Sequence, residues 1–214
     1  MQKQLDLTLY LVLDPVLCGG IAGMVQTTQL AVANGVTAVQ LRSEQAYDRR
    51  DWYQAALALK EVLAETTVPL LINDQVDVAM AVQADGVHVG QSDLPVDVVR
   101  KLIGTEKLIG LSVSNASQMQ SVPWEQVDYL GIGPIYPTNS KSDAAPVLGV
   151  EQLQKLVQSK QCPAVAIGGI NRSNITQVMQ TGVDGVAVIS AICAQPDVGA
   201  ATQQLLQQIR QAQS

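Results

Sequence analysis

The chain contains no phenylalanine, and aromatic side chains make up only 3% of its 214 residues. Its core must therefore consist of Val, Leu, Ile and Ala, a composition that suits β-branched strands packed beneath Ala-rich helices. Basic residues are also scarce, because 13 Lys and Arg face 19 Asp and Glu, for a net charge of −6. This balance argues against a nucleic-acid-binding protein, whose affinity would come from a basic surface. An anionic small molecule can still bind where the few basic residues converge.

Cysteine is sparse as well. Cys18, Cys162 and Cys193 are far apart and form no C-x-x-C pair, so the sequence favours neither a disulfide framework nor a zinc site. The apolar run Leu7–Leu13 is too short for a signal peptide. Residues 15–41 are uncharged but interrupted by Gly, Gln, Thr and Asn, so they make a poor membrane span. We therefore expect a cytoplasmic protein without a membrane partner.

Eight short apolar runs recur along the chain, with stretches of helical spacing between them. Hydrophobic residues make up 47% of the sequence, enough to bury a core, and the length suits one domain over residues 1–214. The apolar runs are Leu7–Leu13, Ala38–Leu41, Val68–Ile72, Gly86–Val89, Leu108–Leu111, Tyr129–Ile132, Ala164–Ile167 and Val186–Ile189. The helical stretches are Met24–Ala33, Trp52–Ala64, Val76–Val82, Pro95–Ile103, Val150–Val157, Ile175–Thr181 and Val198–Ile209.

Near-continuous apolar runs are typical of strands buried on both faces, as in a parallel sheet. Eight strand-then-helix units predict an α/β protein with a single (β/α)8 TIM barrel, small for a fold of usually about 250 residues. A doubly wound open sheet is the alternative, but no G-x-G-x-x-G follows the first run.

Active sites of TIM barrels lie on the loops after the strand C-termini, and polar residues gather there in this sequence. The residues at these positions are Gln40, Arg42, Asn73, Asp74, His88, Gln91, Asp93, Ser112, the 134–141 loop, Gly168, Gly169, Ile189 and Ser190. The opposite strand ends hold mostly turn residues such as Gly35, Pro69 and Gly185.

The loops after the seventh and eighth runs indicate a phosphate site. Gly168 and Gly169 let the backbone approach a ligand closely, and Asn171 or Ser173 would cap the helix that follows. A helix N-terminus presents N–H donors to an anion, and Ser190 after the eighth run can do the same. The simpler alternative is a plain tight turn.

Asp74 and Asp93 follow neighbouring runs, so they can reach one ion. Oxygen ligands without cysteine suit Mg²⁺, which keeps several waters and bridges substrate phosphates. The alternative is that the two carboxylates merely cap the helices that open near Val76 and Pro95.

His88 is the only histidine, and a lone histidine is more often a hydrogen-bonded packing residue than a catalyst. Gln40 and Arg42 point to the same side of the second strand, because strand side chains alternate. The planar fork of Arg42 suits a phosphate, or it forms a surface ion pair with Glu44 or Asp48.

The loop over residues 131–143 is long and carries Thr138, Ser140 and Lys141. Two hydroxyls, backbone N–H groups and an ammonium match a pyrophosphate. Without its place on the active face, an ordinary solvated loop would be the better interpretation.

Taken together, these motifs resemble the thiamine-phosphate synthase family over residues 9–209. The segments that carry the resemblance are VQLR (39–42), INDQVDVA (72–79), ADGVHVGQSDLP (84–95), IGLS (109–112), DYLGIGPIYPTNSK (128–141), VAIGGI (165–170) and GVAVISAI (185–192). The family joins a hydroxymethylpyrimidine pyrophosphate to a thiazole phosphate, with Mg²⁺ as cofactor, and releases pyrophosphate by a dissociative mechanism.

The resemblance also implies roles for single residues. Asp74 and Asp93 would bind Mg²⁺, and catalytic roles would fall to Arg42, Ser112 and Lys141. The residues implied at the pyrimidine pyrophosphate are Gln40, Arg42, Asn73, His88, Ser112 and Lys141. Those implied at the thiazole phosphate are Thr138, Ser140, Gly169, Ile189 and Ser190. The expected partners are these two small phosphorylated substrates and, since barrels of this size often pair, a second copy of the chain in a homodimer.

Other interpretations stay open. An aminothiazole tautomerase has a similar barrel, but its loop after the fifth strand usually carries a histidine, whereas residues 112–115 hold none. A phosphate-binding barrel without activity, sensing thiamine or its precursors, is a second alternative. An epimerase would need paired acid and base residues across the barrel, and Asp14 has no evident partner.

One position departs from the family pattern. The family usually has a lysine that contacts pyrophosphate at the position where this chain has Glu44. In this chain Arg49 and Arg50, from the same loop, are the alternatives for that contact. We expect Glu44→Lys to tighten the binding of the pyrophosphate substrate, because it replaces a repulsive charge with an attractive one. Steady-state kinetics check this, and an unchanged or higher KM would mean that position 44 does not face the leaving group.

Overall fold

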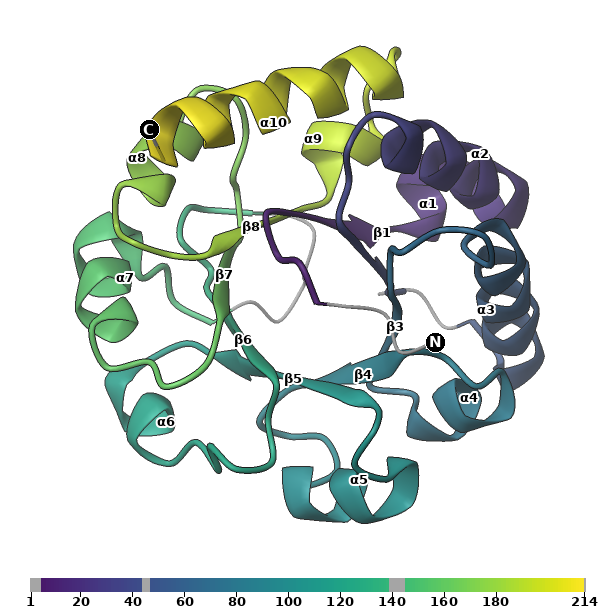
Figure 1. Ribbon diagram of the computed structural model, residues 1–214, viewed down its shortest axis with the longest axis horizontal. Helices are drawn as coiled ribbons and strands as arrows, with labels where there is room; N and C mark the ends of the chain where they lie inside the picture. Colours follow the sequence, from purple (N-terminus) through teal and green to yellow (C-terminus); the bar gives the residue numbers. More distant parts are fainter. Residues whose placement is uncertain (1–4, 44–46, 139–144, 214) are drawn as a thin grey trace.

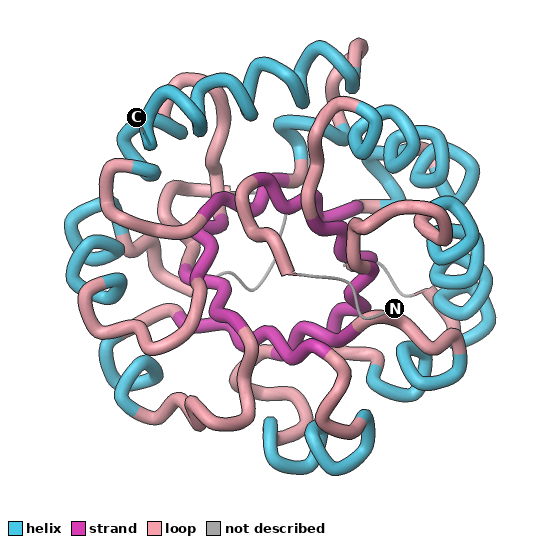
Figure 2. The backbone as a smooth tube through the Cα atoms, in the orientation of Figure 1, coloured by secondary structure: helices cyan, strands magenta, loops and turns pink. Residues whose placement is uncertain are grey.

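The computed structural model describes residues 5–43, 47–138 and 145–213. Within these residues eight parallel strands close into a barrel in the order β1 to β8, and helices surround it (Figures 1 and 2). The strands are β1 (Leu9–Leu13), β2 (Ala38–Leu41), β3 (Leu70–Asn73), β4 (Gly86–Val89), β5 (Leu108–Val113), β6 (Tyr129–Ile132), β7 (Ala164–Ile167) and β8 (Gly185–Val188). The predicted (β/α)8 TIM barrel is confirmed, and the open sheet is wrong because β1 pairs with β8.

The helices that cover the barrel follow the predicted stretches closely, with three additions. The helices are α1 (Pro15–Cys18), α2 (Gly20–Ala33), α3 (Arg49–Val62), α4 (Val76–Ala81), α5 (Val96–Ile103), α6 (Ala116–Gln120), α7 (Gly149–Val157), α8 (Ile175–Met179), α9 (Ser190–Cys193) and α10 (Val198–Gln213). The sequence did not predict α1, α6 and α9, which span four or five residues each. One turn is too short to display a 3.6-residue period.

Strand side chains alternate between two separate cores. In β1, Leu9, Leu11 and Leu13 pack outward beneath the helices, whereas Tyr10 and Val12 point into the barrel. The barrel interior is a smaller cluster composed of Leu7, Tyr10, Val12, Ala38, Leu71, Leu108, Tyr129, Val165 and Ala187. The N-terminal segment crosses the barrel opening (Figures 1 and 2), where Leu5 and Leu7 pack against this cluster. Apolar side chains thereby close the barrel at the N-terminal ends of its strands.

A polar clamp repeats four times at the N-terminal ends of the strands. The residue just before each even-numbered strand donates its N–H to the carbonyl of a residue at the start of the preceding strand, and its side chain accepts the N–H of that same residue. The four pairs are Thr37 with Leu9, Asp85 with Leu70, Asp128 with Ile109, and Asp184 with Ala164. The clamp provides hydrogen-bond partners for backbone N–H and C=O groups at the strand starts and fixes adjacent strands in register.

Two further observations bear on the sequence predictions. Among the described residues no helix is both long and apolar enough to cross a bilayer. All three cysteines are free thiols, as the absence of a disulfide framework predicted. The cytoplasmic location and the homodimer stay predictions.

The clamp at Asp128 yields a stability prediction. Its Oδ2 accepts the Ile109 N–H at 2.7 Å and the Arg100 guanidinium at 2.8 Å. Asp128→Ala leaves both donors without this acceptor and should lower the free energy of unfolding by about 1–3 kcal/mol. Asp128→Asn keeps one acceptor oxygen for Ile109 and should lose less, as urea unfolding can measure.

The control for this prediction is Asp97→Asn. Asp97 forms an exposed ion pair with Lys101 one helical turn away, and such pairs contribute about 0.5 kcal/mol or less. If Asp128→Ala unfolds at the same urea concentration as the control, the clamp does not hold the strands together.

Candidate active site

The barrel mouth brings together the predicted polar residues of β2 to β5. Asn73 and His88 are paired in register at the ends of β3 and β4, and the Asp74 N–H donates to the His88 carbonyl at 2.9 Å. Gln40 and His88 are buried, with 4% and 8% exposure, and Ser112 is half-buried. Four of the predicted substrate residues, Gln40, Asn73, His88 and Ser112, therefore occupy one end of the barrel interior.

A continuous chain of hydrogen bonds links these strands through the barrel interior. The Gln40 amide Nε2 donates to the Tyr10 hydroxyl at 2.8 Å, and that hydroxyl lies 2.8 Å from the hydroxyl of Tyr129. The Tyr129 hydroxyl lies 2.9 Å from His88 Nδ1, and His88 Nε2 lies 2.9 Å from Ser112 Oγ. His88 is thus held at both ring nitrogens, which agrees with the packing role expected for a lone histidine.

The protons of this chain can be assigned by elimination. Tyr10 already accepts from Gln40, so its own proton has only the Tyr129 oxygen to bond. Tyr129 must then donate to His88 Nδ1, which leaves Nε2 protonated and donating to Ser112. With the Gln40 Nε2 facing Tyr10, the reverse direction would leave the Tyr10 proton buried without an acceptor, and only a turned Gln40 amide, with Oε1 facing Tyr10, would allow that direction. Ser112 therefore accepts from His88 and keeps its own O–H for a ligand at the mouth.

The two tyrosines stay neutral. Burial raises the pKa of Tyr10 and of Tyr129 above the ordinary phenol value, and hydrogen bonds only partly offset this for Tyr10. Neither hydroxyl can act as a base near neutral pH, so the chain orients groups and does not supply a nucleophile.

Two glycines make room for this chain. A Cβ on Gly110 would lie 2.2 Å from the Tyr129 ring and 2.4 Å from His88 Nδ1. A Cβ on Gly131 would lie 3.0 Å from the His88 ring. The glycines of β5 and β6 therefore face inward because the rings of Tyr129 and His88 occupy the space beside them.

The capping interpretation of the two carboxylates is wrong. The residues at the N-cap positions of α4 and α5 are Gln75 and Pro95, and neither helix has a side-chain cap. Asp93 Oδ2 instead accepts the Gly90 N–H at 2.7 Å, and Asp74 Oδ2 accepts from the Asn73 amide at 2.7 Å. Both carboxylates thus lie in loops at the C-terminal ends of adjacent strands.

Asp74 also has a strained backbone, with a φ of 57° that side-chain-bearing residues seldom adopt. Such strain persists where the surroundings fix it and is concentrated at functional sites. No group of three acidic, cysteine or histidine side chains gathers around an ion among the described residues. Two carboxylates nevertheless fit Mg²⁺, which takes one or two protein carboxylates and completes its shell with water and phosphate oxygens.

A second region of the mouth is an open cleft of about 710 Å³. It lies where α1, α9 and the loops after β2, β6 and β7 meet, and its wall includes three of the predicted residues, Thr138, Gly169 and Ser190. Asp14 also lines it, but its carboxylate caps α1 by accepting from Val16 and Leu17. Asp14 is therefore engaged in structure, as expected of a residue without a catalytic partner.

The glycine pair after β7 supports one wall of the cleft. Gly168 and Gly169 have φ values of 100° and 64°, and a Cβ on Gly169 would lie 2.6 Å from the Pro137 carbonyl oxygen. The Tyr136 N–H donates to the Gly168 carbonyl at 3.0 Å. The glycines thus let the loops after β6 and β7 lie against each other beside Thr138.

The predicted helix cap after Gly169 is wrong. Helix α8 begins at Ile175 behind Asn174, and no side chain caps it. Asn171 Oδ1 accepts instead from the Ser173 N–H at 2.9 Å, and the Asn174 amide donates to the Gly169 carbonyl at 3.0 Å. These bonds stabilise a turn over residues 169–174. Helix α8 begins only after this turn. Helix α9, whose range the sequence did not predict, begins at Ser190, the residue expected to present N–H donors after the eighth run.

Some predicted residues cannot be placed, or are placed otherwise than expected. Ser140, Lys141 and Glu44 lie outside the described residues. Arg42 directly follows β2, half-buried, and its N–H donates to the Leu13 carbonyl. Arg49, expected as a substitute at the leaving group, pairs with Asp77 on α4 at 3.4 Å between exposed side chains. That pairing does not favour a role at the mouth.

The sequence analysis missed Tyr10 and Tyr129, which lie at the centre of the hydrogen-bond chain. Both were treated only as members of apolar strands. A buried tyrosine needs a partner for its hydroxyl, so the sequence indicates that each has one but not which residue it is. Ile189, predicted behind the thiazole phosphate, immediately precedes α9 and packs on both cores.

Comparison with known proteins assigns the chain to a family. The family model described as thiamine monophosphate synthase matches residues 9–192. The chain is 53% identical to the thiamine-phosphate synthase of Laribacter hongkongensis, over 96% of each chain, and 43% identical to that of Ruminiclostridium cellulolyticum, over 97% of each. The solved thiamine phosphate pyrophosphorylase from Pyrococcus furiosus superimposes with a TM-score of 0.86 at 36% identity, covering 98% of both chains.

The hydrogen-bond chain predicts a single tautomer for the one histidine. Because His88 is the only histidine, its imidazole ¹⁵N signals can be assigned without ambiguity. We expect the spectrum of the Nε2–H tautomer. Tyr129→Phe removes the donor to Nδ1 and should shift the tautomer population and lower the free energy of unfolding by about 1–3 kcal/mol.

Tyr53→Phe is the matched control, because the Tyr53 side chain is exposed on α3 and takes no part in the buried series of hydrogen bonds. It should alter neither the ¹⁵N spectrum nor stability. An Nδ1–H tautomer in the unsubstituted protein would show that the proton order runs the other way.

Proposed function

This chain belongs to the thiamine monophosphate synthase family, transferases of thiamine biosynthesis, and from that premise we propose the reaction that it catalyses. It joins 4-amino-2-methyl-5-hydroxymethylpyrimidine pyrophosphate to thiazole phosphate, giving thiamine phosphate and pyrophosphate. The observation that carries the proposal is the arrangement of the mouth. A neutral polar pocket and two carboxylates that cap no helix lie at the same end of the barrel as an open cleft.

Asp74 and Asp93 are the residues that would hold Mg²⁺. When bound, the ion neutralises charge on the pyrophosphate oxygens. Asn73 fixes the Asp74 carboxylate by donating to its Oδ2, so the ligand is oriented before substrate arrives. Arg42 at the end of β2, together with Lys141, supplies further positive charge to the leaving group.

The pyrimidine pocket is built by the buried hydrogen-bond chain. Ser112 offers its hydroxyl proton, and Gln40 its amide, to the polar edge of a pyrimidine. The residues beneath are neutral, because the buried tyrosine hydroxyls keep their protons. With Tyr129 donating to His88 Nδ1, the imidazole is neutral as well, and a floor without positive charge suits a pyrimidine whose methylene carbon becomes cationic.

The bond changes then follow a dissociative order. The carbon–oxygen bond breaks first, and pyrophosphate leaves with the electron pair. The lone pair of the thiazole nitrogen next forms the new carbon–nitrogen bond. No protein nucleophile or base is required, which agrees with the neutral hydroxyls and the doubly held His88.

The thiazole phosphate belongs in the cleft. Thr138 and Ser190 place hydroxyl groups on its wall, and the left-handed backbone at Gly169 lets main-chain groups approach a ligand. Ser140, two positions after Thr138 in the sequence, is proposed to contact the same phosphate. Ser43 lines the cleft and directly follows Arg42 in the sequence, so the cleft reaches the loop that carries Arg42.

A coupled assay tests the proposal. The purified chain with both substrates and Mg²⁺ should form thiamine phosphate and pyrophosphate, and omission of either substrate or of the metal should abolish product. Asp74→Ala should raise the Mg²⁺ concentration needed for half-maximal rate by at least about tenfold, the scale seen when a metal site loses even an outer partner.

Asp77→Asn is the matched control, since Asp77 is exposed on α4 and paired with Arg49. It should leave the Mg²⁺ requirement unchanged. If Asp74→Ala loses its metal dependence while turnover persists, Asp74 is not a ligand. Thiazole isomerisation without the pyrimidine would indicate a tautomerase, and saturable binding without turnover would indicate a sensor.

A further inference from the structure

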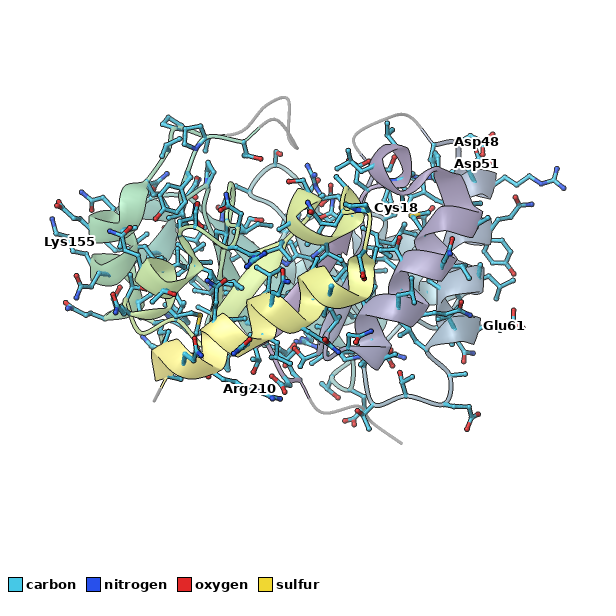
Figure 3. The ribbon with its side chains drawn as sticks, turned by 90° about the horizontal axis from the view of Figure 1, so that it is seen from above. Cys18, Asp48, Asp51, Glu61, Lys155 and Arg210 are labelled. Atoms are coloured by element: carbon cyan, nitrogen blue, oxygen red, sulfur yellow. The ribbon has the colours of Figure 1, made fainter. Side chains whose placement is uncertain are left out.

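Two of the three cysteines meet behind the wall of the cleft. Cys18 ends α1, which follows β1, and Cys193 ends α9, which follows β8. Strands β1 and β8 are the pair that closes the barrel, so residues 175 positions apart become neighbours. Cys193 Sγ lies 3.6 Å from the carbonyl oxygen of Val12 in β1, the strand that leads into α1, and the two thiols are close enough for each to shift the pKa of the other. Figure 3 places Cys18 between the N-terminal helices and the C-terminal part of the chain.

The two thiols differ in environment. Cys18 is half-buried, and its pKa is lowered. The Cys193 thiol and, to a smaller extent, the Thr27 hydroxyl lower this pKa, whereas burial and the charge of Asp14 oppose the shift. Cys193 is 6% exposed, and its single S–H can bond either the Cys18 sulfur or the Val12 carbonyl oxygen, which lies at 3.6 Å. The interaction with the Cys18 thiol and burial raise the pKa of Cys193. A partly accessible thiol of lowered pKa beside a buried partner thiol is the arrangement of reversible redox sites.

We propose that Cys18 and Cys193 form a reversible disulfide, with a peroxide as oxidant, and that this modification tightens the wall of the cleft. The proposal concerns thiols that the synthase reaction does not use. Cytosolic disulfides, where they occur, are mostly transient and redox-sensing.

The chemistry balances in two steps. The Cys18 thiolate attacks one oxygen of hydrogen peroxide, the O–O bond breaks, and the other oxygen leaves as water after protonation, which gives a sulfenic acid. The Cys193 sulfur then attacks the Cys18 sulfur, the S–OH bond breaks, and the hydroxyl leaves as a second water with the thiol proton. Two thiols and one peroxide thus give one disulfide and two waters.

The disulfide would act on the cleft through the helices that carry the cysteines. Pro15, Val16 and Leu17 of α1 line the cleft, as do Ser190 and Ala191 of α9. An S–S bond of about 2.0 Å is much shorter than a hydrogen-bonded sulfur contact, so it draws the two helix ends together. A displacement of about 1 Å at a binding site is enough to change binding markedly.

Cys162 provides an internal control in the same chain. It is half-buried away from the other two, and burial raises its pKa to about 11, so little of it is thiolate near neutral pH. It should react with peroxide far more slowly than Cys18.

The test uses the full chain, oxidised with stoichiometric hydrogen peroxide, alkylated and mapped by peptide mass spectrometry. We expect a Cys18–Cys193 cross-link within one chain, loss of two thiols, alkylated Cys162 and full reversal by dithiothreitol. Cys193→Ser should stop at a sulfenic acid that dimedone traps on Cys18, whereas Cys162→Ser should oxidise like the unsubstituted chain. Preferential oxidation of Cys162, or cross-links only between chains, would overturn the disulfide.

Two measurements test the effect on the cleft. Hydrogen exchange of residues 15–19 and 189–195 should slow by at least about tenfold on oxidation, because a cross-link suppresses local opening. This readout is independent of the proposed reaction. Where that reaction holds, the KM for thiazole phosphate should rise by at least about threefold, and dithiothreitol should reverse the rise. Exchange unchanged by a fully formed disulfide would refute the coupling to the cleft.

Discussion

The candidate site depends on one constraint, namely that polar groups placed inside an apolar barrel must all find hydrogen-bond partners. Tyr10 and Tyr129 are fully buried, and each unpaired hydroxyl there would cost about 1–3 kcal/mol. They satisfy each other at 2.8 Å, and the bonds then extend to Gln40 on one side and to His88 and Ser112 on the other. The residues at the mouth are oriented because they are bonded to buried residues beneath them, which are themselves held by further hydrogen bonds. Binding groups fixed in this way lose little further freedom when a ligand arrives.

The two ends of the barrel divide stability from function. At the N-terminal end the clamp of Thr37, Asp85, Asp128 and Asp184 ties neighbouring strands through main-chain groups. At the C-terminal end the carboxylates of Asp74 and Asp93 bond within their own loops and cap no helix. Aspartates thus hold strands together at one end of the barrel, whereas at the other end they are the residues proposed to bind the metal. The strained backbone at Asp74 persists because the surrounding barrel is stable, and the clamp at the N-terminal strand ends contributes to that stability.

The sequence predicts the fold well because the signals it needs are local. Buried strands are visible as apolar runs, and β2, β4, β6 and β7 have the predicted bounds. Helices of one turn, such as α1 and α9, leave no period to detect, yet they form the cleft. The positions of site residues such as Ser112 follow from the fold, whereas their roles came from the family resemblance and stay predictions. Hydrogen-bond partners are a three-dimensional property, so the pairing of Tyr10 with Tyr129 and of Cys18 with Cys193 could not be read from residues more than 100 positions apart.

The scarcity of aromatic residues has a structural reason at the barrel centre. An eight-stranded barrel has an interior that side chains just fill, so large inward residues must face small ones. The rings of Tyr10, Tyr129 and His88 occupy this interior, with centroids of adjacent rings 5.4–5.9 Å apart. Gly110 and Gly131 lie beside them with no room for a Cβ without a close contact, and Ala38 and Ala187 complete the same core. Further aromatic rings at this level would displace the hydrogen-bonded chain. The small residues therefore serve the polar network, and through it the orientation of Ser112 at the mouth.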